Sequence, residues 1–222
     1  MNTDEFYNEF NLVYNNISSN QAPGLDKYEI SVYLTKSQAA LEDALYAEFE
    51  QSEEARRKLA PLVKTQKVDV VSIPNSNIIY PEYTTTYKSD VLNDVRYIIN
   101  EQVKMSNKAD RCIREKHLRV QPVSHDEIDV IVKNPFRFNI GTALRLDTSY
   151  NNNNYIEILT KDRNIEYYQI RYLKNPDPII LDDFEDKIDG INHTIMTGSL
   201  PKETHRQIVE MAARMAYIDY KS

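Results

Sequence analysis

The spacing of apolar residues changes twice along this chain, and that change restricts the possible folds more than any other feature. Near the start, apolar side chains recur every three or four positions, as on one face of an α-helix: Phe6, Phe10, Val13 and Ile17. From about residue 63 onward, β-branched and aromatic residues form short runs that favour strands. After Pro201 the helical spacing returns. The pattern predicts helices at both ends and a β module between them.

Further signals mark helix boundaries in the N-terminal part. Asp26 followed by Glu29 has the form of a capping box, so a second helix is expected to begin there and to run to about Glu50. Ser52 is expected to cap a short continuation, which Pro61 ends because its ring cannot continue a helix. We expect the first two helices to form an antiparallel pair.

The middle of the chain contains several candidate strands. One lies at residues 68–71, and a second β-rich run extends over residues 78–87. Residues 95–103 favour a strand by their Val, Tyr and Ile content, although a helix is also compatible with them. A short strand is predicted at residues 128–132.

Residues 142–173 carry the clearest strand signal. Leu144 and Leu146 alternate with charged residues, and polar turns are expected at residues 151–154 and 161–164. This arrangement predicts a three-stranded antiparallel meander. Residues 179–181 are expected to add one more strand.

The last predicted helix opens at Pro201, whose missing N–H costs nothing in a first helical turn. Its broad stripe contains small residues and is expected to pack closely on the N-terminal helices. The predicted fold class is α+β: N- and C-terminal helices form a helical layer with an inserted antiparallel β module. The expected domains are an N-terminal helical segment, 1–62, a β-rich module, 63–190, and a C-terminal helix, 191–222.

Composition excludes several classes of protein. The chain has four glycines, and no two are close enough to form a phosphate-binding loop, so no nucleotide cofactor is expected. Cys112 is the only cysteine and has no partner for a disulfide or a zinc ligand pair. No apolar run approaches the roughly 18 residues of a membrane span, and the acidic N-terminus is unlike a signal peptide. We expect the protein to be made and used in the cytosol, or in an assembly that forms there.

Residues capable of catalysis do not form a recognisable motif. Residue types that can bind a metal ion lie close together at one place in the sequence: His125, Asp126, Glu127 and Asp129. Ligands that are adjacent in sequence point in different directions, so no metal site is expected. The acidic run at residues 182–186 does not supply two opposed carboxyl groups across a cleft. We expect no enzymatic activity and no cofactor.

Two segments carry opposite charge in a chain whose net charge is -7. Residues 104–119 contain six basic and two acidic residues, a net charge of +4, and residues 177–189 contain six acidic residues and one lysine, a net charge of -5. Each could simply be a solvated face. The alternative is that they meet between adjacent subunits. The candidate interface residues are Lys104, Lys108, Arg111, Arg114, Arg119, Asp182, Asp183, Glu185 and Asp186.

Three stretches of the sequence resemble structural proteins of crAss-like short-tailed bacteriophages. The opening similarity covers FNLVYNNI, SNQAPGLD and YEISVYLTK at residues 10–17, 19–26 and 28–36. The later ones are IRYLKNP at residues 170–176, leading into residues 179–181, and LPKETHRQIVEMAA at residues 200–213. The last pattern is also similar to the C-terminal helix of tail tubular and head-to-tail adaptor proteins. About a third of the chain is covered, and residues 60–140 are not.

The resemblance implies a structural subunit of a neck or tail ring. Such a subunit would form a dodecameric homo-oligomer that joins the portal to the tail, contacts the portal and other ring or tail proteins, and lines the DNA channel. DNA would pass without sequence-specific binding, since a negative wall repels phosphate. The expected location is the neck or tail of the virion, assembled in the host cytoplasm, with no membrane contact.

Two other functions stay open at this point. One is a different tail or baseplate adaptor that binds a receptor-recognition protein. The other is a tail hydrolase, which would need acid and base groups that converge in the folded chain.

Overall fold

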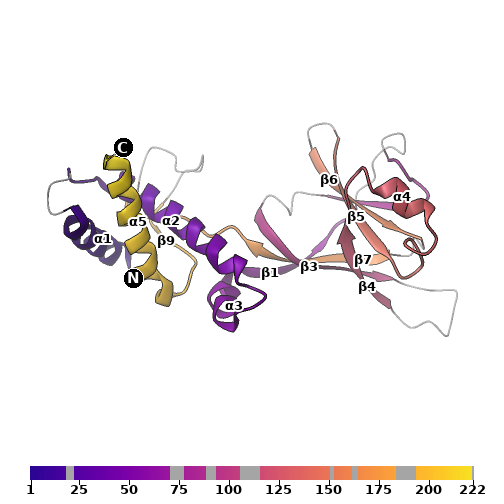
Figure 1. Cartoon of the computed structure of the whole chain (residues 1–222), viewed down its shortest axis with the longest axis horizontal. Helices are drawn as coiled ribbons and strands as arrows, with labels where there is room; N and C mark the ends of the chain where they lie inside the picture. The colour runs from indigo at the N-terminus through magenta and orange to yellow at the C-terminus, as the bar shows by residue number, and fades with distance from the viewer. Residues whose placement is uncertain are drawn as a thin grey trace. The chain divides into compact units, whose positions relative to one another are not determined.

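The structure is a computed structural model that describes residues 1–18, 23–70, 78–88, 94–105, 116–150, 153–161, 165–183 and 194–221. The chain divides into two compact units. Residues 1–62 and 175–222 form one, called the helical unit, and residues 63–174 form the other, called the sheet unit. The fold is mixed α and β (Figure 1).

The helical unit contains four described α-helices, one 3₁₀ turn and a two-stranded sheet. These are α1 (Thr3–Ser18), α2 (Lys27–Ala47), α3 (Glu53–Leu59), η1 (Ala60–Leu62), β8 (Ile179–Ile180), β9 (Met196–Thr197) and α5 (Lys202–Lys221).

Both expected helix caps are present. The Asp26 carboxylate accepts a hydrogen bond from the Glu29 amide at 2.7 Å, and the Glu29 carboxylate accepts one from the Asp26 amide at 3.0 Å. Ser52 Oγ accepts from the Ala55 amide at 3.2 Å at the start of α3. These bonds satisfy amides that have no partner inside the helix. The capping predictions are confirmed.

Helix α5 is the common neighbour of α1 and α2. It packs against both, whereas α1 and α2 touch each other only slightly (Figure 1). Ala212, Ala213 and Ala216 are buried on α5, and small side chains allow close approach of two helices. The sequence predicts that the first two helices pair with each other, but in the structure each packs mainly on α5.

Residues 175–183 belong to the helical unit because polar groups of α2 hold them. Ser31 Oγ accepts from the Leu181 amide at 3.1 Å, and Gln38 Nε2 donates to the Asp177 carbonyl at 2.7 Å. Gly198 lies against the same place with φ of +76°, and a Cβ there would come within 2.4 Å of the Gln38 Oε1 atom. Only glycine allows both the positive φ and this close approach without strain.

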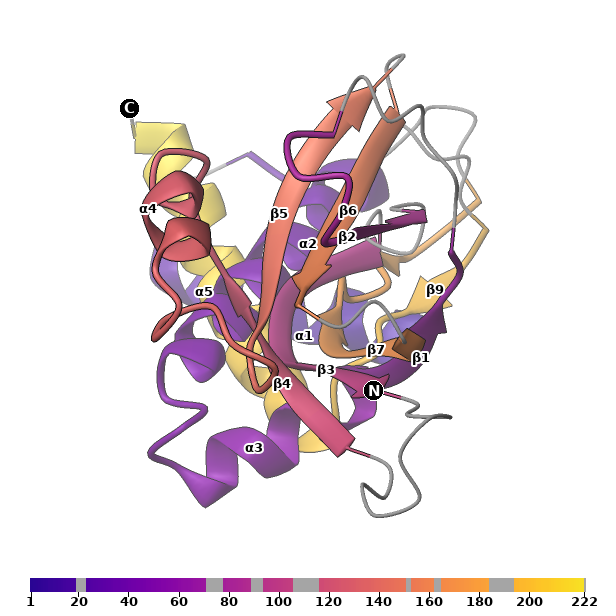
Figure 2. The ribbon, with the colours of Figure 1, turned by 90° about the vertical axis from the view of Figure 1, so that its right-hand side faces the viewer.

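Over its described residues, the sheet unit contains one seven-stranded sheet and one short helix. Its elements are β1 (Val63–Val68), β2 (Thr84–Lys88), β3 (Val95–Met105), β4 (Lys116–Pro122), α4 (Ile128–Lys133), β5 (Ala143–Tyr150), β6 (Asn153–Thr160) and β7 (Ile165–Lys174). The strand order is β1-β7-β3-β4-β5-β6-β2, and the sheet curls strongly (Figure 2).

Strand pairing departs from the predicted antiparallel module in two ways. Strands β4 and β5 are parallel, with Val120 opposite Ala143. Strands β5 and β6 form the expected hairpin, but β7 pairs with β1 and β3, so the predicted three-stranded meander is wrong. Strand β2 takes the place beside β6. Sequence spacing fixes the hairpin, whereas the partners of β7 come from distant parts of the chain.

Residues 128–133 form helix α4, not the predicted strand. Ile128, Ile131 and Val132 have the i, i+3, i+4 spacing of one helix face, and that face packs on Phe138, Leu144, Leu146 and Leu159. Their β-branched side chains suggested a strand, and packing overrides that weak preference. Residues 95–103, compatible with either structure, lie in a strand.

A charged network lies inside the sheet unit. Arg145 Nη1 on β5 is 2.8 Å from Glu101 Oε1 on β3, and Tyr168 on β7 donates a hydrogen bond to the same carboxylate. Glu101 is 5% exposed and Tyr168 is fully buried. Burial opposes the charge on Arg145, but Glu101 and Asp147 outweigh it and raise the pKa of Arg145. Burial and the nearby Glu101 carboxylate raise the pKa of Tyr168.

Truncating a buried side chain of α1 should lower the denaturant concentration at which the helical unit unfolds. Phe10 is fully buried, so Phe10→Ala is expected to lower the free energy of unfolding by about 3–5 kcal/mol. Leu12 on the same helix is 57% exposed, and Leu12→Ala should change it by less than about 0.5 kcal/mol. Urea unfolding followed by circular dichroism measures both. Equal effects would contradict the orientation of α1.

Removing the charge of Glu101 should leave Arg145 without its buried counter-ion, with only the exposed Asp147, 3.3 Å from Arg145 Nε, as an ionic partner. Glu101→Gln is expected to lower the free energy of unfolding by about 3 kcal/mol, as for other broken buried ion pairs. Glu166→Gln is the matched control, because Glu166 also faces a cation, Lys104 at 3.0 Å, but its side chain is 46% exposed. That change should cost under about 1 kcal/mol. If the Glu101 variant is as stable as the control variant, the ion pair with Arg145 does not contribute to the free energy of unfolding.

The buried ring of His205 should make the helical unit less stable in mild acid. His205 Nε2 lies 3.0 Å from the Leu200 carbonyl and Nδ1 lies 2.8 Å from the Met1 amine, and burial lowers the pKa of His205 below 6.5. As pH falls below 6.5, the unfolded chain binds a proton that the folded chain resists, so the free energy of unfolding should decrease. Denaturation at pH 5 and pH 7 measures this. His205→Gln should reduce the difference, and an unchanged difference would rule out His205 as its source.

Candidate subunit interface

The basic segment begins and ends on the hairpin of β3 and β4. Lys104 lies opposite His117, and Arg119 lies opposite Gln102. The side chain of Lys104 is only 13% exposed and its Nζ is 3.0 Å from the Glu166 carboxylate of β7. Lys104 is therefore already paired within its own unit.

Arg119 is exposed and borders a pocket of about 240 Å³ in the sheet unit. Glu101 and Arg145 of the buried network also line it, together with Ile98, Ile99, Asn100, Val120 and Pro122. Arg119 thus adds a second guanidinium to a pocket that already contains an ion pair. Of the predicted basic interface residues that the structure describes, Arg119 is the one available to a neighbouring carboxylate.

The acidic segment begins beside the N-terminus of α2. Asp182 Oδ2 lies 2.7 Å from Lys27 Nζ, and a hydrogen bond from this lysine lowers the pKa of Asp182. The Asp183 carboxylate accepts a hydrogen bond from the Ile195 amide at 3.0 Å. Both aspartates thus hold local structure in the helical unit, and Asp183 stays exposed.

Five of the predicted interface residues lie outside the described residues. They are Lys108, Arg111, Arg114, Glu185 and Asp186. The structure therefore places Lys104 and Arg119 on one hairpin and Asp182 and Asp183 beside α2, and the meeting of the two segments between subunits stays a prediction.

The sequence cluster of His125, Asp126, Glu127 and Asp129 does not form a metal-binding set in the structure. His125 Nε2 lies 3.0 Å from the Asp147 carbonyl, and Asp129 accepts a hydrogen bond from Tyr80. Over the described ranges, no three metal-ligating side chains gather. Within the described ranges, each helix is too short or too polar to span a membrane.

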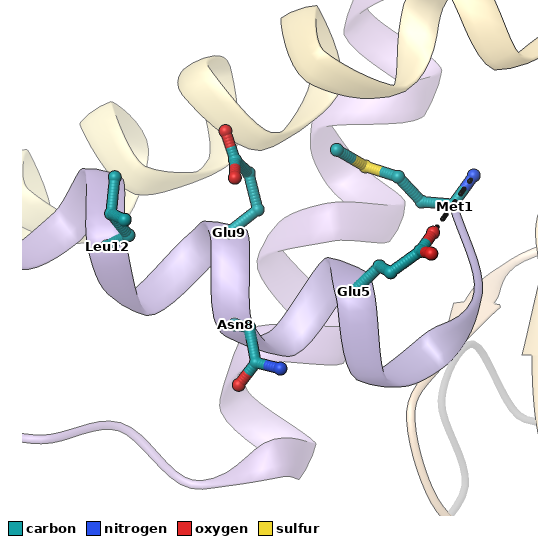
Figure 3. A pocket seen from close by; sticks show the side chains of 5 residues that line it. All are labelled: Met1, Glu5, Asn8, Glu9 and Leu12. Carbon is teal, nitrogen blue, oxygen red and sulfur yellow. Dashed lines mark ion pairs between the residues drawn. The ribbon is translucent and has the colours of Figure 1, made fainter.

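A shallow pocket of about 290 Å³ lies along α1 in the helical unit. Met1, Glu5, Asn8, Glu9 and Leu12 line it (Figure 3). Glu9 and Leu12 project from the same side of α1, and Met1 lies beside Glu5, whose carboxylate is 3.9 Å from the Met1 amine. Most of the pocket surface is apolar although two carboxylates stand on it. Sequence reasoning treated this helix as core and did not single out its outer side.

Exposed apolar residues on α4 and in the segment after it were also missed. Val130 is 63% exposed, Phe136 is 90% exposed and Ile140 is 65% exposed. The sequence signal for the segment is an aromatic residue directly after Pro135 in a polar stretch.

Comparison with known proteins identifies the family. The family model described as phage tail ring protein 3/4 matches residues 1–222. The chain is 27% identical over 236 residues to ring protein 4/5 of Bacteroides phage crAss001, covering 100% of this chain and 94% of that protein. It is 28% identical over 234 residues to ring protein 3 of the same phage, covering 98% and 96%. The resemblance to ring proteins of crAss-like phages is confirmed, and the chain belongs to the phage tail ring protein 3/4 family.

Proposed function

We propose that this chain is a non-enzymatic structural subunit of a phage tail or neck ring. The match of the family model over the whole chain carries the proposal, together with two relatives that are named as ring proteins. The chain works by assembling front to back around an axis, and its location is the virion.

The finer role that we propose is to join the portal to the tail in a dodecameric stack and to line the channel for DNA. A net charge of -7 supports it, because a wall of that sign repels phosphates and lets a duplex slide. The chain's partners would be the portal and further ring proteins, and assembly would take place in the host cytoplasm.

The two units supply what a closed ring requires. A ring needs a heterologous interface, in which two different surfaces of each subunit meet. The helical unit and the sheet unit have separate cores and expose different side chains, so neither surface has to be self-complementary. In this proposal α1, α2 and α5 act as one helical layer, and the basic 104–119 segment faces the acidic 177–189 segment of a neighbour.

Reversing charge in the basic segment should weaken assembly. Lys108→Glu combined with Arg111→Glu is expected to lower the fraction of ring and to reduce its sensitivity to salt. Wild-type protein should give closed circles of about a dozen copies in electron microscopy class averages, with the matching mass in light scattering.

The control pair is Lys64→Glu with Lys161→Glu, two exposed lysines whose reversal changes the net charge equally. Rings that survive the Lys108 and Arg111 changes as well as they survive the control would reject these two residues as interface contacts. A protein that never forms circles, alone or with its portal, and that turns over a substrate would overturn the proposed function itself.

A further inference from the structure

We propose that Phe136 of one subunit inserts into the α1 pocket of the next subunit in the ring. This inference rests on the proposed function and names the contact that would close the ring. It uses one protruding aromatic side chain from the sheet unit and one apolar pocket from the helical unit.

The loop that carries Phe136 is held in place by its own hydrogen bonds. Asn134 Oδ1 accepts from the Phe136 amide at 3.0 Å, and Asn139 Nδ2 donates to the Phe136 carbonyl at 3.3 Å. Thr142 Oγ1 donates to the Arg137 carbonyl at 3.1 Å. The backbone on both sides of Phe136 is thus fixed before any partner arrives, which lowers the entropy lost on binding.

Phe138 anchors the same loop to the sheet unit. Its side chain is 2% exposed and meets the Tyr83 ring edge to face at 5.3 Å. It packs with α4, which lies beside β5 (Figure 2). Two phenylalanines in one turn therefore differ completely: Phe138 is buried in its own unit, and Phe136 is 90% exposed. A large exposed apolar side chain on a rigid loop is typical of an interface anchor.

The α1 pocket has the size and lining to accept such an anchor. Its volume is about 290 Å³ and it is shallow, so a phenyl ring would lie against α1 without being fully enclosed. Leu12, at its edge, is 57% exposed, so it too lacks apolar cover within its own unit. Burying an aromatic side chain removes about 150–250 Å² from water.

Charge selects a second copy of the chain as the occupant. Lys133 and Arg137 flank Phe136 and are exposed. Lys133 Nζ lies 4.0 Å from the Asp129 carboxylate, whereas Arg137 makes no ion pair among the described residues. Glu5 and Glu9 stand along the pocket, and Glu9 likewise has no described ionic partner. The cation beside the aromatic anchor and the carboxylates beside the pocket are opposite in charge, which favours this orientation over the pairing of identical surfaces.

Cysteine cross-linking tests the contact directly. In a Cys112→Ser background, which removes the only thiol, Pro135→Cys protein, which keeps Phe136, is mixed with Asn8→Cys protein that carries a size tag, and the mixture is oxidised. The mixed dimer should form at least several-fold more than either homodimer, because a heterologous contact brings the loop of one copy to the pocket of another. Ile79→Cys, at another exposed position of the sheet unit, replaces Pro135→Cys in the control.

A charge exchange gives a second readout. Arg137→Glu alone and Glu9→Lys alone should each weaken association about tenfold by sedimentation, and the double variant should restore it. Arg137→Glu with Glu50→Lys is the matched control, which should not recover, because Glu50 is exposed but lies outside the pocket.

The outcomes separate this inference from the proposed function. Circles in the microscope with no mixed dimer above the Ile79 control overturn the Phe136 contact and leave the ring intact. A mixed dimer without circles supports the contact and counts against the closed ring. Neither mixed dimer nor circles overturns both.

Discussion

The antiparallel ladder between β1 and β7 is the interaction on which the rest of the structure depends. It pairs Val63 with Leu173, so the first and last strands of the sheet unit lie side by side. The chain enters and leaves this unit at neighbouring points. Helices from both ends of the sequence can then share one core, in which α5 packs on α1 and α2. Without this ladder, the two parts of the helical unit would be separated by a long open loop, whose closure costs entropy.

Buried polar groups specify how each unit closes. In the sheet unit, Glu101, Arg145 and Tyr168 come from three different strands, and the Glu101 carboxylate meets both the Arg145 guanidinium and the Tyr168 hydroxyl. In the helical unit, Ser31, Thr35 and Gln38 of α2 hold the backbone at residues 177–181. An unpaired polar group in either place would cost the full desolvation of that group. These bonds therefore favour one register over alternatives that bury similar apolar area.

The same folding separates side chains that are paired within a unit from side chains that stay exposed. Lys104 and Asp182, both expected at an interface, pair with Glu166 and Lys27 inside their own units. Arg119 remains exposed beside a pocket. Phe136 remains exposed on a loop that its own hydrogen bonds hold in place. In the ring that we propose, each copy would meet two neighbours through different faces, and such differing surfaces fit that arrangement.

The sequence by itself determined the local structure and the family. The spacing of Phe6 and Phe10, the capping box of Asp26 and Glu29, and the β5–β6 hairpin follow from residues close together in the chain. Only the tertiary structure decided that β7 joins β1 and β3, that residues 128–133 form a helix, and that Lys104 is paired while Phe136 is exposed. The physical reason is that these outcomes depend on partners far away in sequence, and local propensities are weaker than the burial and pairing that those partners provide.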